Sequence, residues 1–108
     1  MRLGSRTGNR ALVVYAKVEN HDDDPLGPGS NARAGIVVPK REIPLAVDRN
    51  AVKRKLRHLL AGRLADVPTG TRVVVRGLRP SSKMTSQELA GYLDRALSSA
   101  LKKEAARG

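Results

Sequence analysis

The chain has 108 residues and a formal net charge of +11, from 21 Lys and Arg against 10 Asp and Glu. This length predicts one domain (residues 1–108) with a modest core, and the cationic excess favours a polyanionic partner, most commonly nucleic acid. The absence of cysteine excludes disulfides and thiolate metal sites. No apolar run is long enough to span a membrane or to serve as a signal peptide, so we expect a cytoplasmic protein with no membrane partner.

Two strands are predicted first. Arg10–Val18 is rich in β-branched and aromatic residues, and Arg33–Pro39 contains Ile36, Val37 and Val38, as is typical of strands. The polar residues 19–32 between them include Asp22–Asp24, two prolines and two glycines, and we expect a long, flexible hairpin loop with the two strands antiparallel.

The chain is organised around a predicted helix at Leu45–Leu64, which follows a basic connector, Lys40–Pro44. Apolar residues recur along it at the spacing of one buried helix side: Val52, Leu56, Leu59, Leu60 and Leu64. No acidic residue lies between Arg49 and Leu64, although like charges four residues apart repel in the free protein. The side opposite the apolar one therefore predicts a polyanion-binding face, formed by Asn50, Lys53, Arg54, Arg57 and His58.

The last part of the chain predicts a turn at Pro68–Gly70, a third strand at Arg72–Leu78 and a loop at Arg79–Met84. Thr85 and Glu88 match a capping box. It opens a helix whose apolar stripe comprises Leu89, Leu93, Leu97, Ala100 and Leu101.

The order strand, strand, helix, strand, helix predicts the fold class α+β. We expect a small α/β sandwich in which helices cover a mixed sheet of three or four strands, with a strand–helix–strand crossover. A helix-turn-helix is disfavoured because no second helix adjoins the basic one. Residues 1–9 and 102–108 are expected to be flexible.

The sequence offers few residues for enzymatic or metal chemistry. Neither His21 nor His58 has a Ser or Cys arranged as in a catalytic triad. The acidic run Asp22–Asp24 lacks the ligand spacing of a cation site, so a solvated turn is favoured, and there is no glycine-rich phosphate loop. We expect no catalytic residue and no metal site.

Tyr15 and Tyr92 are the only aromatic residues, which disfavours a surface that stacks several bases. Tyr92 lies near the apolar stripe of the last helix and is expected in the core. Tyr15 shares a strand face with Val13, whereas Leu12 and Val14 occupy the other. The alternation leaves open which of these faces is exposed.

The central segment resembles the signature of the bacterial ribonuclease P protein component. Lys40-Arg41 lead into Ala46–Arg57, where Arg49-Asn50, Lys53-Arg54 and Arg57 follow the spacing of the basic helix of that family. The resemblance extends over nearly the whole chain, through segments similar to the three strands and the closing helix of the family: Asn9–Tyr15, Arg33–Val38, Val73–Arg76 and Ser81–Leu97.

The sequence departs from the family pattern at three places. Ala51 stands where the family has a second arginine, so one RNA contact is expected to be lost there or taken over by Lys55. The connector holds Pro44 where glycine is common, and it is one residue longer. The family begins with a basic, aromatic-containing helix that walls one side of a cleft for single-stranded leader RNA. Here only Met1–Asn9 precede the first predicted strand. Either this member lacks that helix, or the start is misassigned or the sequence is trimmed. Absence of the helix would leave the sheet face half open.

The resemblance implies a ribosomal protein S5 domain 2-like fold and a role beside a catalytic RNA, which removes the 5′ leader from precursor tRNA. Mg²⁺ would be bound mainly by that RNA, which is expected to pair 1:1 with the protein. Contacts to the RNA subunit are implied for Lys40, Arg41, Arg49, Asn50, Lys53, Arg54 and Arg57, and contacts to the leader for the sheet face with Tyr15. Two alternatives stay open: a non-catalytic ribosome-associated or RNA-chaperone domain, and a DNA-binding architectural protein.

Overall fold

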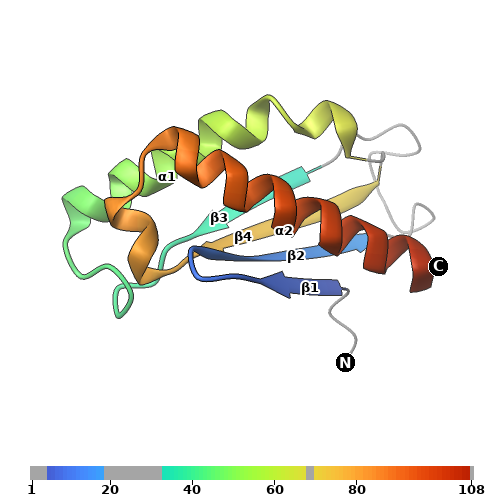
Figure 1. Ribbon diagram of the computed structural model, residues 1–108, viewed down its shortest axis with the longest axis horizontal. Helices are drawn as coiled ribbons and strands as arrows, with labels where there is room; N and C mark the ends of the chain where they lie inside the picture. The colour runs from blue at the N-terminus through green and yellow to red at the C-terminus, as the bar shows by residue number, and fades with distance from the viewer. Residues whose placement is uncertain (1–4, 19–32, 68–69, 108) are drawn as a thin grey trace, which may run out of the picture.

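The computed structural model describes residues 5–18, 33–67 and 70–107. Its four strands form one mixed sheet in the order β1-β2-β4-β3, and both helices lie on the same side of it (Figure 1). This arrangement confirms the predicted α+β sandwich. The elements are β1 (Ser5–Gly8), β2 (Leu12–Val18), β3 (Arg33–Val37), α1 (Ala46–Ala61), the 3₁₀ helix η2 (Leu64–Asp66), β4 (Thr71–Gly77), the 3₁₀ helix η3 (Arg79–Lys83) and α2 (Ser86–Arg107).

The strand pairing differs from the predicted hairpin. β2 pairs antiparallel with β1 and β4, and β3 pairs parallel with β4, so β4 lies between the two strands expected to be neighbours. β4 is paired along both edges, and its residues Val73 and Val75 are fully buried. The crossover from β3 through α1 to the parallel β4 confirms the predicted strand–helix–strand unit. The predicted loop at residues 19–32 lies outside the described residues.

The core lies between the sheet and the two helices. Leu12, Val14 and Ala16 of β2 point toward the helices and have no exposed surface. Most of the two predicted apolar stripes is buried: Val52, Leu56, Leu60, Leu89, Leu93, Leu97 and Ala100. The other predicted members, Leu59, Leu64 and Leu101, are partly buried against the core, and Leu64 lies in η2 beyond the end of α1. Tyr92, expected in the core, is partly buried against it.

The flexible ends expected at residues 1–9 and 102–108 are corrected for the parts that the structure describes. Ser5–Gly8 form β1, which pairs with β2, and α2 continues to Arg107. The Ser5 hydroxyl donates to Glu104 Oε1 at 3.0 Å, so the two ends of the chain are joined by a polar contact. Hydrophobic periodicity does not report contacts of this kind.

The start of α2 is fixed by the predicted capping box. The Thr85 backbone N–H donates to Glu88 Oε1 at 2.9 Å, and the Glu88 N–H donates to Thr85 Oγ1 at 3.1 Å. The segment before it is a 3₁₀ helix (η3) rather than the predicted loop. Within the described ranges, neither helix is long and apolar enough to cross a membrane.

Candidate nucleic-acid interface

The outward side of α1 carries a row of polar and cationic side chains. Val52, Leu56 and Leu60 bury the opposite side of this helix, and the residues that face away from the core are exposed: Asn50, Arg54, Arg57 and His58, with Lys53 half-buried at the flank. Asp48, in the first turn, is the one acidic residue of the helix. We call Asn50, Lys53, Arg54, Arg57 and His58 the α1 face, which does not include Asp48. Their positive charge sits on a rigid element, which suits the recognition of a polyanion.

Arg49 and Lys55 differ from the cations of the α1 face because each is engaged within the protein. Arg49 Nη1 donates to the carbonyl oxygens of Ile43 at 3.0 Å and Pro44 at 2.7 Å. Lys55 Nζ donates to the Met84 carbonyl at 3.1 Å, beside η3. The expectation that Lys55 takes over the contact missing at Ala51 is therefore not supported by its position.

The basic connector is a tight, anchored turn. The N–H groups of Glu42 and Ile43 donate to the Pro39 carbonyl, each at 3.1 Å, and Ile43 is buried. Arg79 fastens the turn to η3, because its backbone N–H donates to Glu42 Oε1 at 2.9 Å and its Nη2 to the Arg41 carbonyl at 3.1 Å. Lys40 and Arg41 are thereby exposed on an ordered segment next to the start of α1.

Tyr15 lies on the face of the sheet that carries no helix in the described structure. Leu12, Val14 and Ala16 point toward the helices, so the strand alternation places Tyr15 on the other side. The register aligns it with Arg6 of β1 and Val74 of β4. The Arg6 guanidinium carbon is 5.9 Å from the centroid of the Tyr15 ring. The structure thus decides what the sequence left open: Tyr15 is on the open face.

Several cations that the sequence analysis did not select share this open face. By register, Arg6, Lys17, Arg72 and Arg76 surround Tyr15, and the described positions of the open face include no acidic residue. Arg76 has a buried Nε with no hydrogen-bond partner in the described structure. The signal was present in β4, where Arg72 and Arg76 have the opposite parity to the buried Val73 and Val75.

A groove separates α1 from the edge strand β3. It has a volume of about 330 Å³ and is lined by Ala34 and Ile36 of β3, by Arg57, Leu60 and Ala61 of α1, and by Leu64. Arg57 therefore borders both the α1 face and the β3 edge of the sheet.

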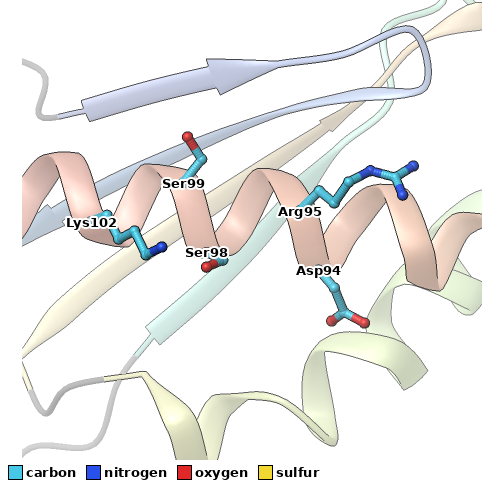
Figure 2. A pocket seen from close by; sticks show the side chains of 5 residues that line it. All are labelled: Asp94, Arg95, Ser98, Ser99 and Lys102. Carbon is cyan, nitrogen blue, oxygen red and sulfur yellow. The ribbon is translucent and has the colours of Figure 1, made fainter.

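The outer side of α2 has a different electrostatic character. Figure 2 shows Asp94 directed toward α1, with Arg95, Ser98, Ser99 and Lys102 along a shallow pocket. The Asp94 carboxylate accepts hydrogen bonds from Arg63 Nε and, at 3.1 Å, from Arg63 Nη2. These bonds lower the pKa of Asp94 and raise that of Arg63. This pair joins the C-terminal end of α1 to α2, and it leaves less uncompensated charge here than on the α1 face.

His58 and the acidic residues of the described ranges do not gather at one place. Among the described residues, no group of three or more His, Asp or Glu lies close enough to hold a metal ion. His58 is exposed on the α1 face. His21 and Asp22–Asp24 lie outside the described residues.

The fold and these two surfaces define a class of protein, the small α+β domains that bind a nucleic acid. Comparison with known proteins gives the family. The family model described as Ribonuclease P matches residues 1–101. A ribonuclease P protein component of Streptomyces bikiniensis is 44% identical over 100 residues, covering 90% of this chain and 79% of that protein. One of Acidothermus cellulolyticus is 41% identical over 97 residues, covering 90% and 75%. The solved RNase P protein of Staphylococcus aureus superposes with a TM-score of 0.71 at 28% identity, covering 90% of this chain and 81% of that one.

This chain belongs to the ribonuclease P protein family. It is thus a component of a tRNA-processing ribonucleoprotein, whose partner is RNA. The sequence-based identification is confirmed, and the ribosome-associated alternative is not favoured. The roles of individual residues toward RNA stay predictions.

Proposed function

We propose that this protein assists a catalytic RNA subunit in removing the 5′ leader from precursor tRNA, by binding the RNA subunit with α1 and the leader with the open face of the sheet. The observation that carries the proposal is the α1 face, where Arg54 and Arg57 are exposed and no acidic residue interrupts the cations. Neutralising phosphates there lowers the repulsion between RNA subunit and substrate.

The two surfaces can act at the same time because they point in different directions. The helices form one layer and the sheet the other (Figure 1). The α1 face lies on the side of α1 that is turned away from the core. Tyr15 lies on the opposite side of the molecule, on the face of the sheet without helices. One protein molecule can therefore contact the RNA subunit and the leader together.

Bond cleavage in this proposal belongs to the RNA subunit with its Mg²⁺. Mg²⁺ prefers oxygen ligands such as carboxylates, and the described residues form no acidic cluster. The protein would reduce the Mg²⁺ concentration that the RNAs need to fold and dock, because its cations take over part of the charge neutralisation. The reaction would take place in the cytoplasm.

The proposal assigns different tasks to neighbouring residues. Asn50, Lys53, Arg54 and Arg57, with Lys40 and Arg41 of the connector, contact phosphates of the RNA subunit. Arg49 holds the connector through its two bonds to backbone carbonyls. Tyr15 packs against a leader base without reading its sequence, beside the charge of Arg6.

Reconstitution tests the proposal. The protein is added to a ribonuclease P RNA and precursor tRNA at low Mg²⁺, and leader release is followed over time. We expect faster cleavage than with the RNA alone. The absence of any acceleration would contradict the proposal and would favour the ribosome-associated or the DNA-binding alternative.

Single variants then separate the two surfaces. Tyr15→Ala should weaken binding of precursor tRNA by about 5- to 100-fold, the value of one base stack, with little effect on mature tRNA, which lacks a leader. Tyr15→Phe keeps the ring and serves as the matched control. Equal losses for precursor and mature tRNA would show that Tyr15 does not contact the leader.

A further inference from the structure

The start of α1 exposes two large apolar side chains. Leu45 is 66% exposed and Val47 is 77% exposed. Only one other large apolar side chain in the described ranges is comparably exposed, Val37 on the open face of the sheet at 49%. Two of the three thus lie two residues apart at one end of the basic helix.

Neither residue favours the stability of the helix start in the free protein. Leu45 occupies the N-cap of α1, where Ser, Thr, Asp or Asn would accept a hydrogen bond, and it makes no side-chain cap. Val47 is β-branched and exposed, and alanine would favour the helix more. A hydrophobic staple does not explain them, since that motif joins the residue before the N-cap to the fourth helical residue, here Pro44 and Arg49. Leu45 thus departs from N-cap preference and Val47 from helix propensity. Such departures from local sequence preferences are expected at functional sites.

The surroundings identify the kind of partner. At 100° per residue, Val47 lies on the same side of α1 as Asn50 and Arg54, and both of these are exposed. Val47 and Arg54 are seven residues apart, about 10 Å along the helix axis, which a stacked strand covers in about three nucleotides. Lys40 and Arg41 are exposed on the connector that leads into this end of the helix. A chain that lays its phosphates on these cations brings its riboses and bases against Val47. Leu45, two residues earlier, lies about 200° from Val47 around the helix axis and adds apolar surface at the N-terminal end of α1.

A second copy of this chain is a poor occupant. Each molecule carries a formal net charge of +11, so pairing two copies through this end of α1 would bring two cationic faces together. The exposed cations Lys40, Arg41 and Arg54 outnumber the one exposed carboxylate beside the pair, Asp48, and this balance favours a nucleic acid instead.

We propose that Val47, together with Leu45 at the helix start, forms an apolar anchor around the N-terminal end of α1, and that Val47 packs on the ribose or an unstacked base of a nucleotide in the RNA subunit, next to the phosphates held by the α1 face. This inference rests on the proposed function and extends it from charge neutralisation to a non-ionic contact. The anchor would fix where the cationic helix sits along the RNA, because apolar packing requires a particular nucleotide position whereas phosphate contacts repeat along the strand.

Leu45→Ser gives a test in which folding and binding change in opposite directions. Serine supplies the missing N-cap oxygen, so the melting temperature of the free protein should rise. Affinity for the transcribed ribonuclease P RNA should fall by about five- to tenfold, since an apolar contact is lost. A purely structural role would move stability and affinity together. Unchanged or tighter RNA binding by this variant would overturn the proposal.

The salt dependence distinguishes the anchor from the cations. Val47→Ala should weaken RNA binding by about fivefold and leave the slope of log affinity against log salt unchanged, because no charge is removed. Val47→Thr, which keeps the shape but replaces a methyl group by a hydroxyl, should weaken binding in the same way. Val37→Ala, the same truncation on the sheet face, is the matched control and should bind the RNA subunit normally.

The outcomes separate this inference from the function on which it rests. If Arg54→Ala weakens binding and the Val47 variants do not, the anchor is wrong and the proposed function stands. If no α1 variant changes RNA binding and cleavage is not accelerated, the proposed function itself fails. Sedimentation of the free protein completes the test, since a dimer that dissociates on Val47→Ala would show that a second copy covers the pair.

Discussion

At the scale of single residues, the cations of α1 are not equivalent although they share one motif. Arg54 is exposed, and among the described residues it makes no hydrogen bond or ion pair. Arg49 instead donates to the carbonyls of Ile43 and Pro44. The sequence spacing predicts the same role for both, because it reports which helix side a residue occupies but not the path of the connector that supplies those carbonyls.

This difference predicts opposite behaviour for two alanine variants. Arg54→Ala should weaken binding of the RNA subunit and reduce the salt slope by about 0.9, the value of one phosphate contact, with an unchanged melting temperature. Arg49→Ala should lower the free energy of unfolding by about 1 kcal/mol, because two carbonyls lose a charged donor. Binding across a salt series and urea unfolding measure both effects. A loss of salt slope without a loss of stability in Arg49→Ala would show that Arg49 contacts phosphate directly.

Tyr15 shows where alternation stops being informative. Both faces of β2 carry apolar residues, Leu12 and Val14 on one and Val13 and Tyr15 on the other. The choice depends on which face α1 and α2 cover, and that is a property of the whole sheet. The same information would have selected Arg72 and Arg76 as surface candidates.

At the scale of secondary-structure elements, the two helices could be predicted and the strand neighbours could not. Each helix has its own apolar stripe, and α2 has its own cap, so the information is local. Strand order depends on contacts between residues far apart in the sequence. The residues of β2 and β3 do not show that β4 lies between these two strands. β1 was missed because Ser5–Gly8 has a single non-polar residue, a glycine, and is held by pairing and polar contacts.

The capping box gives a prediction for α2 as an element. Thr85→Ala removes the hydroxyl that accepts from the Glu88 N–H, and it should lower the free energy of unfolding by about 1 kcal/mol. Thr85→Ser keeps the acceptor and should be close to the wild type. Chemical denaturation with circular dichroism compares the two variants. Equal stabilities would mean that packing of Leu89 and Leu93 alone fixes this end of the helix.

At the scale of the whole molecule, charge dominates the balance between folding and binding. A formal net charge of +11 is held within principal extents of 40 × 28 × 26 Å. Arg63 and Asp94 form an ion pair, and a pair this exposed contributes about 0–1 kcal/mol. Most of the positive charge is therefore uncompensated in the free protein, and bound RNA would relieve its repulsion.

The same repulsion predicts that salt has opposite effects on the free protein and on its complex. The Debye length is about 30 Å at 10 mM salt, comparable to the molecule, and about 8 Å at 150 mM. The melting temperature of the free protein should therefore rise by a few degrees, about 2–5 °C, between these concentrations, while affinity for the RNA subunit falls steeply. Thermal melts in chloride at several concentrations measure the first effect, and a sulfate series at matched ionic strength separates screening from anion binding. A melting temperature that falls as chloride rises would show that attractive pairs, not repulsion, dominate the electrostatics of the fold.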